Sequence, residues 1–434
     1  MSEQLFPPSA KVDGHESKSP WIAENNKALR ELLECLENRN CLENQSKCLN
    51  ECGRLNAVLV IILGSPHFTQ SRVAPLTEAT SAEDIWARSI ISALRFRGFT
   101  YLVTPNHHRA LQLYNMFPDL VRAVFLEPDD VRQCWDDPEF CVLSDDNPDG
   151  IPIWKIFSFQ WWADVRHPLG APWILQPEDY TLQHPEWQRS TYIGYTIEES
   201  CRSRSLIPVN EREERAYVMT KWSENFEPGP ETAWPEDYYE TAVRELGIGF
   251  VAGANHRDGD SGVELPQTIQ NLGQMARIDF QHHIAFSKVL IGVGRPAVPV
   301  TPYEALCLGV PFLNPILEVP MLLLLAHQLT EEPFLQWDHE NPGDKSKWKS
   351  QHELLALLAP PYVYNVRHDD RDGFVQAIKN AVANPIPSYV LPRMRMYSVA
   401  FRLNNLMHEN WQREAAQVLE RRKSGEEQGP LFVL

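Results

Sequence analysis

The part of the sequence with the most chemical content is a glycine turn followed by the start of a helix. Gly292 and Gly294 close an apolar run that predicts a buried strand, and a helical pattern begins at Thr301. Backbone N–H groups at such a turn and at a helix N-terminus face a bound anion, and the helix dipole favours negative charge there. The pattern therefore predicts a site for a diphosphate. Dinucleotide-binding enzymes share it, although their G-x-G-x-x-G fingerprint is absent here.

Glu304, in the first turn of this predicted helix, has two interpretations. With Thr301 as the N-cap and Pro302 as the first helical residue, Glu304 would complete a capping box that needs no ligand. In the second interpretation, the carboxylate accepts hydrogen bonds from the hydroxyls of a nucleotide's ribose. The spacing alone favours the cap.

Two patterns that resemble metal ligands are better explained as ordinary structure. Asp258 and Asp260 have the D-x-D form, but they lie in a polar loop where Asp and Gly are common turn residues. The histidine pairs at 107–108 and 282–283 lack the i, i+4 spacing that places two ligands on one helix face. We therefore expect no metal site.

Two successive series of strands and helices must position these residues. The first series opens with the apolar run Asn56 to Gly64 and contains a helical pattern closed by Gly98, and the second follows a charged linker near residues 203–214. The second series includes a helical pattern over residues 269–287. Alternating strands and helices predict parallel sheets that are covered on both faces. We expect two α/β domains, residues 55–204 and 205–393, that face a cleft.

The two ends of the chain flank these domains. Residues 1–54 predict a helix and a cysteine-rich collar, and residues 394–434 predict a long helix that packs back on the first domain. Four closely spaced cysteines in the collar lack the paired spacing of zinc ligands, so disulfides in an oxidising compartment are favoured over free thiols. These are Cys35, Cys41, Cys48 and Cys52, and a glycosylation sequon lies among them at Asn44.

Charge and hydropathy exclude several classes of function. The net charge of −18 argues against a nucleic-acid-binding protein, which needs a basic face. No apolar run reaches the length that crosses a bilayer, and the polar N-terminal sequence lacks the apolar core of a signal peptide. We therefore expect neither a nucleic-acid partner nor a membrane span.

The segment from Leu265 to Pro315 resembles the donor domain of the α-1,6-mannosylglycoprotein 6-β-N-acetylglucosaminyltransferases, the enzymes that branch N-glycans. Residues 169–200 and the run Ser350 to His352 also have counterparts in that family. The resemblance implies a GT-B architecture of two Rossmann-like domains, UDP-N-acetylglucosamine as donor and an N-glycan of a glycoprotein as acceptor. It also implies transfer to the 6-hydroxyl of an α-mannose with inversion at the anomeric carbon, no metal or other cofactor, and a place in the Golgi.

The resemblance also assigns roles to individual residues. Glu304 would contact the donor nucleotide. The catalytic base of the family lies about fifteen residues before the glycine that ends the first long helix, which points to Glu83, with Asp84 as the neighbouring alternative. A carboxylate there takes the proton from the attacking hydroxyl. The competing explanation is that both are ordinary first-turn acids that complement the helix dipole.

Two cations complete the predicted donor site. The family uses a lysine in the stretch before Ser350, and Lys345 is the best match, with Lys347 and Lys349 as alternatives. Arg295 follows the glycine turn directly and would supply positive charge to the diphosphate leaving group. This second assignment rests on physical reasoning alone, and a surface ion pair explains Arg295 equally well.

One segment departs from the family pattern. Residues 316–336 contain an apolar run that has no counterpart in the family. If that run disrupts the donor domain, the chain would be an inactive glycan-binding or scaffold protein on a GT-B fold. A GT-B transferase that uses another UDP-sugar or another acceptor is the second alternative.

Overall fold

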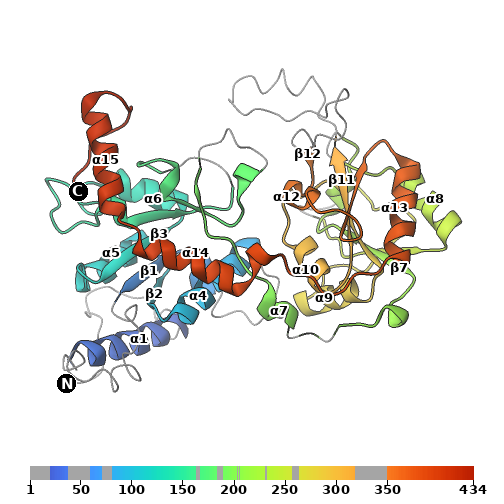
Figure 1. The fold of residues 1–434 in the computed structure, drawn as a ribbon, viewed down its shortest axis with the longest axis horizontal. Helices are drawn as coiled ribbons and strands as arrows, with labels where there is room; N and C mark the ends of the chain where they lie inside the picture. The colour runs from blue at the N-terminus through green and yellow to red at the C-terminus, as the bar shows by residue number, and fades with distance from the viewer. Residues whose placement is uncertain are drawn as a thin grey trace.

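The computed structural model describes residues 20–37, 59–70, 81–162, 167–182, 189–202, 204, 206–229, 232–256, 263–317 and 349–434. Figure 1 shows two domains side by side, with the C-terminal helices returning from the second domain to the first. The prediction of two α/β domains with parallel sheets is confirmed. The cysteines at 41, 48 and 52 and the sequon at Asn44 lie outside the described residues, as do Asp258, Asp260 and Lys345.

The first domain contains a six-stranded sheet in the order β2-β1-β3-β4-β5-β6, and all its strand pairs are parallel. Its strands are β1 (Val60–Gly64), β2 (Thr100–Thr104), β3 (Val121–Leu126), β4 (Ile156–Phe159), β5 (Ile174–Gln176) and β6 (Thr191–Tyr192). Strand β1 is apolar and fully buried, as expected for a central parallel strand. Because β1 lies between β2 and β3, the residues that follow these three strands share one edge of the sheet.

Four helices follow the strands of the first domain: α3 (Pro66–Gln70), α4 (Ala82–Arg97), α5 (His107–Met116) and α6 (Pro128–Trp135). Helix α4 buries its apolar face at Trp86, Ile90, Ile91 and Leu94. It ends at Gly98, whose φ of 73° is the left-handed conformation that glycine adopts without steric cost. The predicted end of this helix is therefore confirmed.

The second domain contains a seven-stranded sheet in the order β12-β11-β10-β7-β8-β9, with β13 paired to β11. The strands are β7 (Arg215–Met219), β8 (Gly249–Ala252), β9 (Ile269–Asn271), β10 (Val289–Gly292), β11 (Phe312–Leu317), β12 (Lys349–Ser350) and β13 (Val363–Arg367). Only β12 is antiparallel among these described strands. The helices are α8 (Glu236–Leu246), α9 (Arg277–Ala285), α10 (Thr301–Cys307), α12 (Glu353–Ala356) and α13 (Arg371–Ala383).

The helix expected over residues 269–287 is wrong in its first part. Residues Ile269–Asn271 form strand β9, and the helix α9 begins only at Arg277. Gly273 lies between them with a φ of 72°, a conformation that does not continue a right-handed helix. The consequence is that Arg277 stands at the start of α9, where it faces α10.

The C-terminal tail forms two helices and not one. Helix α14 (Met396–His408) ends at Glu409, whose backbone is extended, and α15 (Trp411–Ser424) begins after Asn410. Both helices contact the first domain, because Arg97 Nε donates to Ala400 O at 3.2 Å and Trp411 packs edge-on against Trp173. The tail therefore ties the two domains together (Figure 1).

The N-terminal helix α1 (Pro20–Glu37) lies beside β2. The buried amide of Asn25 donates to Val103 O at 2.7 Å and accepts from Val103 N at 2.9 Å, so it continues the hydrogen bonding of the edge strand. Two disulfides join cysteines that the sequence shows as scattered, Cys134 to Cys141 and Cys201 to Cys307. No described helix is both long and apolar enough to span a membrane.

Candidate active site between the two domains

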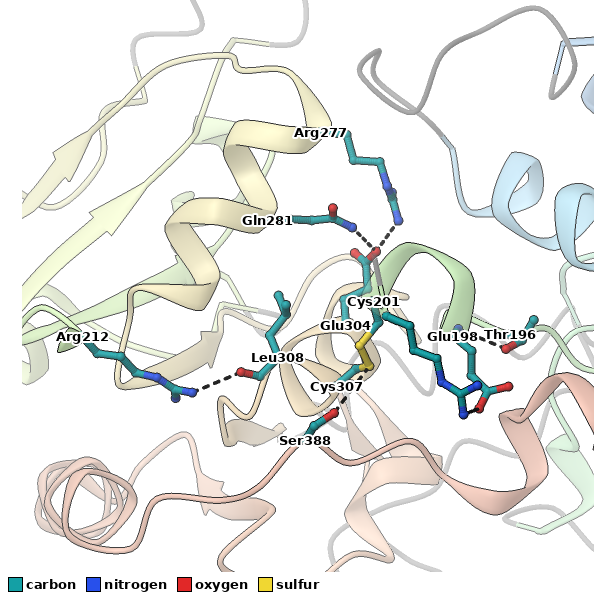
Figure 2. Close-up of a disulfide and its surroundings, with 11 residues drawn as sticks. Thr196, Glu198, Cys201, Arg212, Arg277, Gln281, Glu304, Cys307, Leu308 and Ser388 are labelled. Atoms are coloured by element: carbon teal, nitrogen blue, oxygen red, sulfur yellow. Dashed lines mark hydrogen bonds and ion pairs between the residues drawn. A yellow bond between two sulfur atoms is a disulfide. The ribbon is translucent and has the colours of Figure 1, made fainter. Parts of the chain in front are cut away.

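Glu304 is a buried carboxylate in the first turn of α10. Arg277 Nη2 and Gln281 Nε2, both from α9, donate to the same oxygen, Oε1, the second at 2.8 Å. Figure 2 shows both side chains pointing at Glu304. The other oxygen, Oε2, accepts no hydrogen bond from any residue that the structure describes. The two donors thus fix the carboxylate while one oxygen stays available to a ligand.

The capping-box interpretation of Glu304 is wrong. Helix α10 starts at Thr301, so Thr301 is the first helical residue, and the N-cap is the apolar Val300, which has no side-chain hydrogen bond. The first helical N–H groups pair with the Val300 carbonyl, at 3.0 Å from Tyr303 N. Since the guanidinium of Arg277 attracts the carboxylate more strongly than a backbone N–H does, Glu304 turns toward α9.

Sequence reasoning missed Arg277. Its position at the start of α9 is unfavourable for the helix dipole, which repels a cation there. A cation in that position signals a specific anionic partner, and the partner is Glu304. The two side chains are 10% and 4% exposed, so they form a buried ion pair.

The glycine turn is filled by another side chain of the chain. Gln351 accepts a hydrogen bond from Gly294 N at 3.1 Å and donates to Pro296 O at 3.1 Å. Gly292 leaves the room for this side chain, because a Cβ at that position would collide with Gln351 Oε1. Gly294 has a φ of 103°, which requires glycine. The two glycines therefore shape the turn around Gln351, and the N–H of Gly294 is already paired.

The remaining predicted donor residues lie around this turn. Arg295 is exposed and precedes Pro296 in a cis peptide bond, and Thr301 is half-buried. Lys345 is outside the described residues. Lys349, the alternative lysine, is half-buried in β12, which pairs with the end of β11.

On the first domain, the predicted base Glu83 lies in the first turn of α4 and is half-buried. The capping box of this helix is made by its neighbour: Ser81 Oγ accepts from Asp84 N at 3.1 Å, and Asp84 Oδ2 accepts from Ser81 N at 3.0 Å. Within the part of the chain that the structure describes, the Glu83 carboxylate makes no hydrogen bond or ion pair. Asp84, and not Glu83, therefore caps this helix.

Asp84 has a second partner that the sequence did not reveal. His67, in α3 directly after β1, shares a hydrogen bond with it, 2.8 Å from His67 Nδ1 to Asp84 Oδ1. This bond, more than the nearby charges of Glu127, Asp84 and Glu83, raises the pKa of His67. Burial tends to raise the pKa of Asp84, but the bonds from His67 and Ser81 outweigh burial and lower it. The hydrogen bond between them therefore favours the charged forms of both side chains.

Two further polar residues lie at this sheet edge. Ser65, which follows β1, donates a short hydrogen bond to Glu127, which follows β3. Burial raises the pKa of Glu127, although the Ser65 bond opposes the shift. The described residues contain no group of three or more His, Cys, Asp or Glu side chains arranged to hold a metal ion.

The domains meet at a buried polar junction formed by Glu178, Tyr195, Tyr303 and Arg393. Tyr195 Oη donates to Glu178 Oε1 at 3.2 Å, and Arg393 Nη2 donates to Tyr303 Oη at 3.3 Å. Burial raises the pKa of Glu178 to about 7. Because Tyr303 precedes Glu304 in α10, the junction is directly attached to the candidate donor site.

The Cys201–Cys307 disulfide lies beside this junction and joins α7 (Glu198–Arg202) to α10, with a Cα–Cα distance of 6.2 Å (Figure 2). The same segment bonds to the C-terminal tail, since Glu198 Oε2 accepts from Met396 N at 2.7 Å. Helix α10 is thus held from both sides of the domain boundary.

Comparison with known proteins places these features in a family. The α-1,6-mannosylglycoprotein 6-β-N-acetylglucosaminyltransferase A of Cricetulus griseus is 22% identical over 223 residues, which cover 50% of this chain and 27% of that protein. The protein of the same name from Homo sapiens is 21% identical with the same coverage. The match therefore spans little more than a quarter of the length of these relatives. An alpha-glucosyltransferase solved with UDP and DNA aligns at 10% identity and a TM-score of 0.40, covering 81% of this chain and 99% of that chain.

The family match is broader than any of these pairwise similarities. The pattern of glycosyltransferase family 18 covers residues 154–414, which is more than half of the chain. This range includes the glycine turn, Glu304, Arg277 and the junction. The resemblance that the sequence predicts is confirmed, and the chain belongs to glycosyltransferase family 18.

Proposed function

We propose that this chain transfers N-acetylglucosamine from UDP-N-acetylglucosamine to the 6-hydroxyl of an α-mannose in an N-glycan. The observation that carries the proposal is the buried Glu304, which α9 holds through Oε1 while Oε2 stays unpaired among the described residues. Ribose hydroxyls are donors that such an oxygen accepts. The names of the relatives supply the sugar and the acceptor.

The donor binds in the second domain in this proposal. Glu304 accepts from the nucleotide, and Thr301 and the turn that Gly292 and Gly294 shape around Gln351 lie beside the diphosphate. Arg295 and Lys345 contribute positive charge to the leaving group. We add Arg277 to these proposed donor residues, because its guanidinium pairs with Glu304.

The reaction is an inverting displacement. The acceptor oxygen forms a bond to the anomeric carbon while the bond from that carbon to the diphosphate oxygen breaks, and UDP leaves with the electron pair. The acceptor proton passes to a base of the first domain. Glu83 stays in the proposal as the catalytic carboxylate, because it lies at the first turn of α4 and its neighbour Asp84 makes the cap.

No metal ion is needed in this scheme, because cations of the protein stabilise the departing diphosphate. We expect transfer to continue when a chelator is added. A loss of activity with the chelator would return Asp258 and Asp260 to consideration as metal ligands. Because the proposed acceptor is an N-glycan, we propose that the protein acts in the lumen of the Golgi.

Thermal denaturation with a set of nucleotides tests the donor assignment. A ligand that binds only the folded state at 100 times its Kd stabilises the protein by about 2.7 kcal/mol, which raises Tm. We expect UDP and UDP-N-acetylglucosamine to raise Tm, and NAD to leave it unchanged. A rise with NAD and none with UDP would contradict the proposal, and a larger rise with a different UDP-sugar would reassign the donor.

A further inference from the structure

A short segment of the chain, residues 196–201, joins α4 of the first domain to α10 of the second. At one end, Ser89 Oγ of α4 accepts a hydrogen bond from Thr196 N at 3.0 Å. At the other end, Cys201 forms the disulfide with Cys307 of α10, and both cysteines are buried (Figure 2). We call this segment, together with the contacts at its two ends, the interdomain bridge.

The interdomain bridge is fixed along its length by further hydrogen bonds. The buried hydroxyl of Ser89 also donates, and its proton is shared between Thr196 O at 3.0 Å and Ile85 O at 2.9 Å. Glu198 N donates to Thr196 Oγ1 at 3.1 Å, and the Glu198 carboxylate accepts from Met396 N at 2.7 Å. Because buried polar groups lose free energy when their partners are removed, these bonds hold the bridge in one conformation.

Each end of the interdomain bridge lies near a carboxylate that the proposed reaction uses. In α4, Ser89 follows Glu83 by about 9 Å along the helix axis. In α10, Cys307 lies one helical turn after Glu304. The bridge therefore links the helix of the proposed base to the helix of the carboxylate at the donor nucleotide.

The donor site has its own supports within the second domain. Arg277 and Gln281 fix the Glu304 carboxylate from α9. Just after the end of α10, Gly309 O accepts from Arg212 Nη1 at 2.6 Å. A break in the interdomain bridge therefore leaves these contacts in place, but it frees α4 to move relative to them.

We propose that the interdomain bridge positions Glu83 against the donor that Glu304 binds, and that it acts on kcat and not on donor affinity. This inference rests on the proposed function, in which Glu83 takes the proton of the acceptor hydroxyl. Proton transfer requires the base within hydrogen-bond reach of that hydroxyl. A misplacement of about 1 Å by a change far from the reacting atoms lowers the rate by about 10²-fold.

The first test removes the covalent end of the interdomain bridge. In the double variant Cys201→Ala, Cys307→Ala we expect kcat with UDP-N-acetylglucosamine and a biantennary N-glycan to fall by about 10²-fold. The Kd for UDP, measured by calorimetry, should stay at the wild-type value. The matched control is Cys134→Ala with Cys141→Ala, which removes the disulfide inside the first domain. Both double variants lose the stability that a disulfide gives, but the control should keep the wild-type kcat.

The second test breaks the other end and leaves the disulfide intact. Ser89→Ala removes the hydrogen bonds to Thr196, so it should also lower kcat without a change in the Kd for UDP. Because the two ends belong to one bridge, their effects should not add. We expect the triple variant, which combines Ser89→Ala with the changes at Cys201 and Cys307, to have a kcat close to that of the slower of the two.

These measurements separate a positioning role from a purely structural one. A Tm rise with UDP shows that a variant is folded, and if one variant does not fold, the variant at the other end decides. A folded variant that keeps the wild-type kcat, that loses donor affinity as much as kcat, or whose effect adds fully to that of the other end would overturn the inference. If the wild type itself transfers nothing, the proposed function fails, and the inference that rests on it fails with it.

Discussion

The sequence identifies Glu304 as a candidate donor-site residue, but it does not reveal which side chains surround its carboxylate. The family resemblance predicts it at the donor nucleotide, whereas its spacing predicts a capping box, and the structure excludes the box. The partner Arg277 lies 27 residues earlier, in a helix whose start the sequence places too early. Local patterns do not report such a contact, because it depends on how α9 and α10 pack.

The buried ion pair predicts a large effect on stability. Glu304→Gln leaves the buried Arg277 guanidinium without a counter-charge, so we expect the free energy of unfolding to fall by about 3 kcal/mol. Urea denaturation measures this loss. Glu31→Gln, which breaks an exposed pair with Lys27, is the control and should change the free energy by less than about 1 kcal/mol. Equal effects of the two substitutions would mean that the Arg277–Glu304 pair is not buried in solution.

At the scale of the elements, the sequence predicts most of what is local. The run Val60–Gly64 is a buried strand because it is continuously apolar, and α4 ends at Gly98 because glycine accepts a positive φ. The contents of the glycine turn were not predictable, because Gln351 reaches it from 57 residues away. The glycine turn predicts an anion site with free N–H groups. In the structure, one of these groups, the N–H of Gly294, donates to the side chain of Gln351.

The packing of this turn predicts that a side chain in place of Gly292 destabilises the fold. In Gly292→Ala the new Cβ collides with Gln351 Oε1 and approaches Pro315 Cδ to 2.8 Å, so Gln351 must move and its bond to Gly294 is lost. We expect the free energy of unfolding to fall by about 1–3 kcal/mol.

Gly249→Ala is the control for this substitution, because the nearest atoms to its Cβ lie at 3.9 Å. Denaturant unfolding of both variants decides the question. If Gly292→Ala is as stable as Gly249→Ala, Gln351 does not fill the turn.

At the scale of the whole molecule, the domain boundary is assembled from segments that are far apart in the sequence. Glu178 belongs to the first domain, Tyr303 to α10, and Arg393 to the segment before the C-terminal helices. The Cys201–Cys307 disulfide joins residues 106 positions apart. Sequence patterns predicted two α/β domains, but neither this pairing nor the buried carboxylate at the boundary, because both depend on how the domains meet.

The raised pKa of Glu178 should make the stability of the folded protein depend on pH. The unfolded chain releases the Glu178 proton near its ordinary pKa of 4.5, whereas the folded chain retains it to about pH 7. The contribution of Glu178 to the free energy of unfolding therefore falls by about 3 kcal/mol as the pH rises from 4.5 to 7, and it stays constant above pH 7.

Glu178→Gln removes this loss, because glutamine does not ionise and still offers an oxygen to Tyr195 Oη. We expect the stability of the variant relative to the wild type to increase between pH 4.5 and 7, measured by urea denaturation at several pH values. Parallel curves for the two proteins would show that Glu178 ionises without cost in the folded state.

Sugar transfer itself tests the central claim most directly. The purified protein is incubated with UDP-N-acetylglucosamine and a biantennary N-glycan in the presence of a chelator, and the product is examined by mass spectrometry and by NMR of the new linkage. We predict one added N-acetylglucosamine in β-linkage to the 6-hydroxyl of an α-mannose, and a strong loss of transfer in Glu83→Gln. A wild-type protein that binds UDP but forms no product, or a Glu83→Gln variant that transfers as well as the wild type, would contradict the account.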